Sequence, residues 1–248
     1  MGYPHTTPGC NEIVIIRGFV KCSQTVVGGW FHALCVECLV VTPPMPLRAS
    51  CGALVLAAGA GSRFVGTTHK LLVPIAGKPV VRHVLEAVAT SGVSPIIVVT
   101  GAVPLDGVLA TPLPGNPEVI VTHNEHWQSG MASSLQCGLV VARQRGLAGV
   151  VVGLGDQPGI PASAWRQVAD TIAPIAVATY HGVRRNPVRI HAELWDQLPH
   201  DGDEGARTLI RVRPELVTEV ACEGNADDID TADDVARWQQ RLANQGEH

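Results

Sequence analysis

The sequence predicts an α/β domain of three layers, in which a mostly parallel sheet lies between two layers of helices. From residue 53 onward, short apolar runs alternate with amphipathic stretches. The run 96–99 is made of β-branched residues, which is typical of strands covered on both faces. Hydrophobic residues make up 46% of the 248 positions and charged residues 16%, so a large core can form and global disorder is excluded.

The expected elements follow one another in the alternating order that this Rossmann-like architecture requires. Apolar runs bounded by turn residues predict strands at 53–58, 95–100, 119–122, 150–154, 175–179, 188–190 and 217–221. Amphipathic stretches predict helices at 80–90, 131–145, 162–171, 192–198 and 232–243. Thr231, followed three residues later by Asp234, predicts a cap on the last helix. In such folds ligands bind at the carboxyl ends of the strands, so the residues just after each strand are the first candidates for a site.

Charge and hydropathy argue against several classes of partner. The net charge is −4 and no run of Lys or Arg occurs, so no nucleic-acid partner is expected. No apolar stretch reaches about 18 residues, so no membrane partner is expected either. The amino terminus lacks the pattern of a signal peptide, and we expect a cytoplasmic protein with its seven cysteines reduced.

Composition changes near residue 45. Residues 1–44 hold four of the seven cysteines and show no sustained helical or strand period. We expect 1–44 to be a poorly ordered extension, or the product of an over-long gene call with Met45 as the natural start. A small partner-binding tail is the third interpretation. The catalytic domain is expected to span 45–248.

A glycine-rich loop follows the first strand. It reads Leu56-Ala57-Ala58-Gly59-Ala60-Gly61-Ser62-Arg63-Phe64, and Lys70 comes shortly after it. Small residues let backbone N–H groups approach a phosphate, and the two cations add positive charge, so the loop suits a triphosphate. The dinucleotide fingerprint lacks its third glycine, and the Walker A pattern has Thr67 where it requires lysine.

Two carboxylates follow other predicted strands. Asp156 comes after the strand 150–154, and Asp230 follows the strand 217–221 in an acidic segment. A carboxylate at the end of a buried strand is costly unless it binds something. The alternative for Asp156 is a cap on the helix that begins near Pro161.

These motifs resemble those of nucleotidyltransferases with the nucleotide-diphospho-sugar-transferase (GT-A-like) fold. The glycine loop is similar to their L-A-[AG]-G-x-[GS]-x-R-[FM]…K signature, 155–158 to their G-D-x-P motif, and 228–234 to their D-[IV]-[DN]-T-P-[ED]-D motif. The resemblance implies that Asp156 and Asp230 bind Mg²⁺, with Mn²⁺ as a substitute. The gap from Arg63 to Lys70 is longer than in many relatives, and Ala232 replaces the usual proline.

Three further segments resemble the molybdenum cofactor cytidylyltransferases: 122–134, 185–188 and 202–207. Together the motifs span 53–236. The resemblance implies that CTP is the preferred nucleoside triphosphate, that molybdopterin is the acceptor, and that a recipient molybdoenzyme is a further partner. The implied catalytic residues are Arg63, Lys70 and Asp156. The implied nucleotide-binding residues are Leu56, Ala57, Ala58, Gly59, Gly61, Arg63, Lys70, Asn124, Ser133 and Asp156. The implied acceptor-binding residues are Asn186, Asp203 and Arg207.

The function implied is Mg²⁺-dependent transfer of a cytidylyl group from CTP to the phosphate of molybdopterin, with release of pyrophosphate. Ala58 stands where guanylyltransferases of this branch carry glycine, and its methyl group is expected to disfavour a purine. Two alternatives stay open. One is a nucleotidyltransferase for another phosphorylated acceptor, such as a sugar phosphate or phospholactate, and the other is a non-catalytic chaperone for the molybdenum cofactor.

Overall fold

The computed structural model describes residues 50–66 and 68–245, with side chains as far as Leu242. These residues belong to one compact unit, Ala49–His248. The predictions made for 1–44 lie outside the described residues. No helix in the described ranges is long and apolar enough to cross a membrane.

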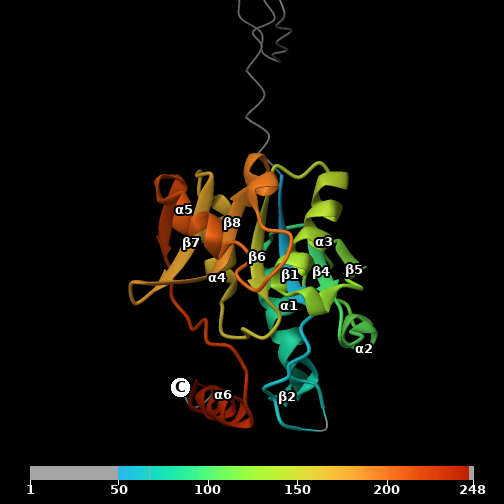
Figure 1. Ribbon diagram of the computed structural model, residues 1–248. Helices are drawn as coiled ribbons and strands as arrows, with labels where there is room; N and C mark the ends of the chain where they lie inside the picture. The colour runs from blue at the N-terminus through green and yellow to red at the C-terminus, as the bar shows by residue number, and fades with distance from the viewer. Residues whose placement is uncertain (1–49, 67, 246–248) are drawn as a thin grey trace, which may run out of the picture. The chain divides into compact units, whose positions relative to one another are not determined.

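A seven-stranded sheet in the order β5-β4-β1-β6-β8-β7-β9 forms the centre of the fold (Figure 1). Six strands run in the same direction and only β8 is antiparallel to its neighbours, which confirms the mostly parallel sheet. The strands are β1 (Cys51–Ala57), β4 (Ile96–Thr100), β5 (Val119–His123), β6 (Gly149–Leu154), β7 (Ile175–Tyr180), β8 (Val183–His191) and β9 (Val217–Ala221).

Helices cover both faces of this sheet, as the alternating pattern predicts. Alternate residues of β1 point to opposite sides, so that Val55 packs in one core cluster and Leu54 in the other. The first cluster includes α1 (Val80–Ser91) and α4 (Ala162–Asp170). The second includes α3 (Met131–Gln144), the 3₁₀ helix η3 (Ala192–Gln197) and α5 (Arg207–Val212). The three-layer prediction is therefore confirmed.

The last helix, α6 (Ala232–Gln245), packs beside a small hairpin at the lower end of Figure 1. The hairpin consists of β2 (Pro74–Ile75) and β3 (Lys78–Pro79). Thr231 and Asp234 form the predicted cap, because each backbone N–H donates to the other's side chain, at 2.7 and 3.2 Å. Ile75, Val80, Ile229 and Val235 are buried together there in a third cluster, which fixes the segment before α6 against the hairpin.

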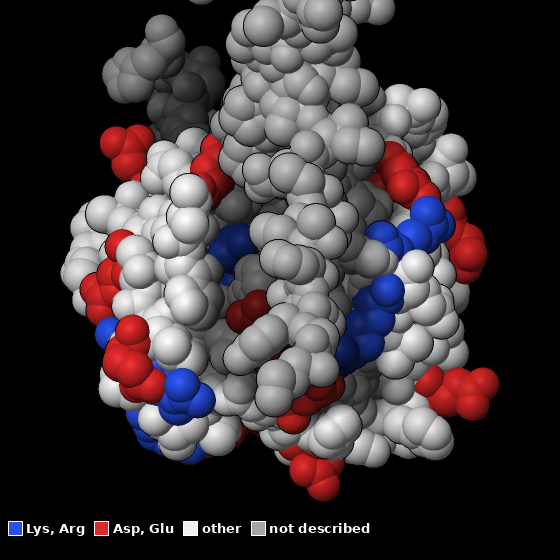
Figure 2. Space-filling model, turned by 90° about the horizontal axis from the view of Figure 1, so that it is seen from above, with Lys and Arg blue, Asp and Glu red and all other residues white. Residues whose placement is uncertain are grey.

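The candidate site lies at one end of the strands, and charged side chains surround the other end. The carboxyl ends of the parallel strands, where the candidate site lies, point toward the bottom of Figure 1. Figure 2 views the molecule from the opposite side, where acidic and basic side chains are interspersed.

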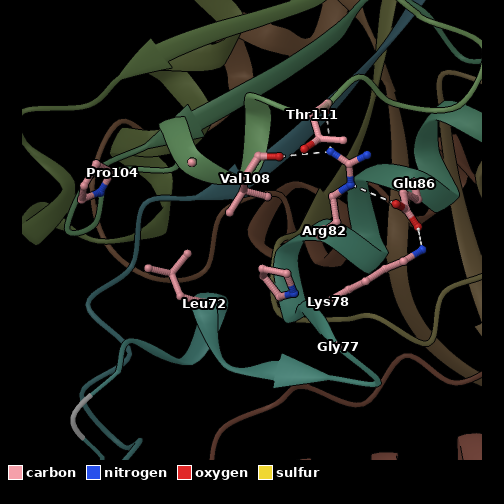
Figure 3. Close-up of a pocket in the computed structure, with 10 residues that line it drawn as sticks. Leu72, Gly77, Lys78, Arg82, Glu86, Pro104, Val108 and Thr111 are labelled. Carbon is pink, nitrogen blue, oxygen red and sulfur yellow. Dashed lines mark hydrogen bonds and ion pairs between the residues drawn. The ribbon is translucent and has the colours of Figure 1, made fainter.

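A buried arginine connects the amino-terminal turn of α1 to the segment around the short helix α2 (Asp106–Leu109). Arg82 is 8% exposed, and its guanidinium donates to the carbonyls of Val108, Thr111 and Pro112 at 3.1, 2.6 and 2.7 Å. Its Nε pairs with Glu86, at one end of a cavity of about 440 Å³ (Figure 3). None of the predicted site residues lines this cavity.

Replacing Arg82 with methionine should lower the free energy of unfolding by about 2–4 kcal/mol, because three backbone carbonyls lose their donor and Glu86 keeps only Lys78 as an ionic partner. Urea unfolding followed by circular dichroism measures this change. Arg211→Met is the control: Arg211 forms an ion pair with Glu204 on the surface and should contribute nothing measurable. Equal stabilities of the two variants would contradict the role given to Arg82.

Candidate active site

The glycine loop begins where β1 and β4 end side by side. The Ala58 carbonyl accepts a hydrogen bond from the N–H of Ala102 at 3.0 Å. A Cβ atom on Gly101 would lie 2.7 Å from the Ala58 oxygen and 2.8 Å from the Ala58 Cβ, so only glycine permits this approach. Ala58 is 3% exposed, and its methyl group is therefore packed between the strand ends. The backbone of Gly59, in contrast, borders open space.

The loop then folds back so that Lys70 lies beneath it. Gly61 has a φ of +63°, and a Cβ there would lie 3.1 Å from Lys70 Cγ. The His69 ring is within hydrogen-bonding distance of the Gly59 carbonyl, with 3.0 Å from Nε2 to the oxygen. Lys70 opens the 3₁₀ helix η1 (Lys70–Leu72), in which Leu71 is buried. Lys70 therefore lies against the glycine loop, although more residues separate it from Arg63 than in many relatives.

Both predicted carboxylates converge on Lys70. Its Nζ donates to Asp156 Oδ2 at 2.6 Å and to Asp230 Oδ1 at 2.7 Å. Arg63 Nη1 donates to Asp230 Oδ2 at 3.0 Å. The four residues predicted from separate motifs therefore form one contiguous group of charges.

The backbone explains why the two carboxylates meet. The Leu56 carbonyl accepts from the N–H of Gly155 at 2.9 Å, which places Asp156 beside the start of the glycine loop. The Asp156 carbonyl in turn accepts from the N–H of Ile229 at 2.9 Å. Because Ile229 is buried, this bond holds Asp230 next to Asp156, although the two are far apart in sequence.

The charges of this group stabilise one another. Desolvation disfavours the ammonium of Lys70, but Asp156 and Asp230 outweigh it and leave the pKa of Lys70 above its ordinary value. The hydrogen bond from Lys70, with a smaller contribution from Arg63, lowers the pKa of Asp230. Lys70 is therefore cationic and Asp230 anionic at neutral pH.

One oxygen of the pair is left without a partner. Asp156 Oδ1 is buried and accepts no hydrogen bond within the described part of the chain. An unpaired buried carboxylate oxygen is costly, and a hard cation is one ligand that would satisfy it. The described residues, those of this site included, hold no group of three or more His, Cys, Asp or Glu side chains arranged for a metal. The two aspartates fit Mg²⁺, which is commonly held by one or two carboxylates together with phosphate oxygens and water.

Two residues that the sequence prediction omitted support the carboxylates. Gln157 Nε2 donates to Asp228 Oδ1 at 2.8 Å, and its Oε1 accepts from Asn186 Nδ2 at 2.9 Å. Desolvation, followed by the negative charge of Asp156, raises the pKa of Asp228. Asn186, predicted to bind the acceptor, is thus tied to the residue after Asp156. Gln157 occupies the variable position of the 155–158 motif, and Asp228 is the first aspartate of the 228–234 motif, but the motifs assign neither a role.

Asn124 and Ser133 lie together at the end of β5. Asn124 Nδ2 donates to the hydroxyls of Ser133 and Ser134 at 2.9 and 3.0 Å, and Asn124 Oδ1 accepts from the N–H of His126 at 2.9 Å. Asn124 is 5% exposed. Its polar atoms are thus engaged in fixing the turn that leads into α3, and a role in nucleotide binding stays a prediction.

Asn124→Ala should lower the free energy of unfolding by about 1–3 kcal/mol, because the hydroxyls of Ser133 and the buried Ser134 lose a donor and the N–H of His126 loses its acceptor. Chemical denaturation measures the change. Gln144→Ala, which removes an exposed side-chain amide at the end of α3, is the control for the amide. Unchanged stability in Asn124→Ala would contradict the structural role.

The predicted acceptor residues of the 202–207 segment lie at the start of α3. Asp203 Oδ1 accepts from the N–H of Met131 at 3.3 Å, and the Gly202 carbonyl accepts from the N–H of Ala132 at 2.9 Å. Asp203 therefore caps α3 from a distant part of the chain. Arg207 is exposed and forms no ion pair within the described residues, so its charge is available to a ligand.

Comparison with known proteins places the chain among the nucleotidyltransferases. A family model described as the MobA-like NTP transferase domain matches residues 53–220. Among the curated relatives, the bifunctional protein GlmU of Rhizorhabdus wittichii is 37% identical over 129 residues. That alignment covers 50% of this chain and only 27% of GlmU, so the chain spans about a quarter of this relative's length.

Solved structures agree with the fold. Rv0371c from Mycobacterium tuberculosis H37Rv is 27% identical with a TM-score of 0.65, and the match covers 77% of this chain and 98% of that one. Rv0371c has also been solved in complex with manganese. A nucleotidyl transferase from Methanothermobacter thermautotroptrophicus has a TM-score of 0.67 at 22% identity, covering 79% of this chain and 99% of that one, and supports the fold alone.

Proposed function

The chain belongs to the family of MobA-like NTP transferase domains, and from this premise we propose that it transfers a cytidylyl group from CTP to the terminal phosphate of molybdopterin. The observation that carries the proposal is the convergence of Asp156 and Asp230 on Lys70 Nζ directly beside the glycine loop. This arrangement places two cations and two carboxylates where a strand end exposes backbone N–H groups.

In the proposed reaction, a phosphate oxygen of the acceptor attacks the α-phosphorus of CTP. A new P–O bond forms, the bond between the α-phosphorus and its bridging oxygen breaks, and pyrophosphate leaves. The attacking phosphate is already anionic at neutral pH, so the reaction needs no general base. Catalysis therefore depends on positioning and on charge stabilisation.

Each residue of the charged group has a task in this scheme. Backbone N–H groups of 59–61 would receive the phosphates, with Arg63 and Lys70 offsetting their negative charge. Asp156 and Asp230 would hold the divalent cation, which when bound neutralises charge on the phosphate oxygens. Arg207 is the proposed contact for the acceptor phosphate. Asn186 is proposed to position the acceptor site through its hydrogen bond to Gln157, and Asp203 through its hydrogen bond to the start of α3.

A second candidate is transfer to another phosphorylated acceptor, such as a sugar phosphate or phospholactate. It is favoured by one observation: Asp203 and Asn186 are engaged in internal hydrogen bonds, whereas the exposed Arg207 suits any phosphate. The non-catalytic chaperone remains the third candidate.

Incubation with each of four nucleoside triphosphates, Mg²⁺ and each acceptor, followed by mass spectrometry of the products, separates these candidates. We expect a cytidylylated molybdopterin with CTP and a smaller yield with GTP. A product formed only with a sugar phosphate or phospholactate would select the second candidate. Retention of intact molybdenum cofactor without pyrophosphate release from any nucleotide would select the chaperone.

A further inference from the structure

The ammonium group of Lys70 lies between the two carboxylates that are proposed to hold the divalent cation. Three of the four oxygens of Asp156 and Asp230 hold a cationic partner, Lys70 twice and Arg63 once, at 2.6, 2.7 and 3.0 Å. The fourth, Asp156 Oδ1, is buried without a partner. A metal bound to both aspartates would therefore meet the ammonium group of Lys70 at close range.

The protein holds this ammonium in place from several sides. The Lys70 side chain is only 12% exposed, and its Cγ lies against Gly61. The neighbouring residues anchor its backbone, since Leu71 is buried and His69 bonds to the Gly59 carbonyl. Arg63, in contrast, is 80% exposed in its side chain and can move away from Asp230 at little cost. Lys70 is thus the principal competitor for the cation position.

We propose that Lys70 is a placeholder for the metal. In the nucleotide-free protein its ammonium bridges Asp156 and Asp230 and offsets part of their negative charge, and the divalent cation enters as the triphosphate draws Lys70 toward its own oxygens. Nucleotide and metal then bind with positive coupling, because each favours the arrangement in which Lys70 has left the carboxylates. The inference rests on the proposed function, which supplies the metal and the triphosphate.

Mn²⁺ binding to the nucleotide-free full chain, measured by electron paramagnetic resonance, tests the proposal. Lys70→Met should bind Mn²⁺ at least about tenfold more tightly than the wild type, because the competing charge is gone. Lys78→Met is the matched control: it removes the same charge from an exposed lysine paired with Glu86 outside the site, and should not change the affinity. Adding Asp156→Asn to Lys70→Met should abolish the gain. Equal or weaker binding by Lys70→Met would overturn the proposal.

A second measurement uses the native sequence and therefore does not depend on the folding of a variant. The chain has only three lysines, Lys21, Lys70 and Lys78, so acetylation of each can be followed by peptide mass spectrometry. Without metal, Lys70 should react more slowly than Lys78. Mn²⁺ alone, at concentrations that fill the site, should accelerate the labelling of Lys70 and leave Lys78 unchanged. Unaltered protection of Lys70 with Mn²⁺ bound would reject the placeholder role.

The outcomes separate this inference from the proposed function. If Mn²⁺ binds the wild type, is lost in Asp156→Asn and gains nothing from Lys70→Met, the metal site stands and the placeholder role falls. If Lys70→Met shows the gain but the wild type releases no pyrophosphate with any nucleotide, the placeholder role stands and the proposed function falls.

Discussion

Replacing Asp156 with asparagine should lower the rate of nucleotidyl transfer by about three orders of magnitude while the fold is kept. Asparagine has nearly the same shape, so the strand end and the bond from Ile229 to the backbone carbonyl remain. What is lost is the negative charge that pairs with Lys70 and that would hold the cation. Pyrophosphate release measures the rate, and thermal unfolding by circular dichroism checks the fold.

Two further variants make this result specific. Asp233→Asn removes an exposed carboxylate from the first turn of α6 and should keep wild-type turnover. Asp230→Asn should fall between the two, because the Asp230 side chain is 29% exposed against 15% for Asp156, so water screens its charge more strongly. Wild-type turnover in Asp156→Asn would remove Asp156 from the metal site.

Lys70→Met should reduce turnover by about two to three orders of magnitude. The variant loses the buried cation that is proposed to meet the phosphates, although it should bind Mn²⁺ more tightly. Lys70→Arg should not rescue the rate, because a planar guanidinium does not fit the space that a compact ammonium occupies between two carboxylates. Steady-state kinetics at saturating CTP measures both variants.

Lys78→Met again serves as the control and should retain wild-type rates. The informative comparison is between binding and turnover: tighter Mn²⁺ binding together with slower transfer identifies Lys70 as a group that acts on the phosphates. Unchanged kcat in Lys70→Met would mean that the lysine only balances the charge of the two aspartates.

Much of the fold and the centre of the site could be predicted because both depend on local patterns. The apolar run of β4 has strand character whatever surrounds it, and parallel strands bring their carboxyl ends to one edge. Asp156 and the glycine loop follow two such strands, so their proximity follows from topology. Asp230 follows β9, which is an edge strand separated from β6 by β8 and β7. Asp230 reaches the site because the segment between β9 and α6 passes beside Asp156, where the N–H of Ile229 donates to the Asp156 carbonyl.

Other features depend on contacts that no local pattern encodes. Asp203 caps α3 across 72 residues of sequence. The hairpin strands β2 and β3 have two residues each, two of the four being prolines, so they carry no strand signal. The contact of the Ala58 methyl group with Gly101 is one of these contacts, and the predicted effect of Ala58 on the choice of base stays a prediction. The strand β8 begins five residues before its predicted start, because the hairpin with β7 extends beyond the apolar run.

The most direct test of the central claim is the fate of the individual phosphorus atoms of CTP. The wild-type chain is incubated with molybdopterin and Mg²⁺, and CTP is labelled with ³²P either at the α or at the γ position. The account predicts that the α label appears in the acceptor product and the γ label in pyrophosphate, in equal amounts, and that Asp156→Asn loses both together. Transfer of the γ label to the acceptor, or its release as orthophosphate, would contradict attack at the α-phosphorus and with it the nucleotidyl transfer proposed for this site.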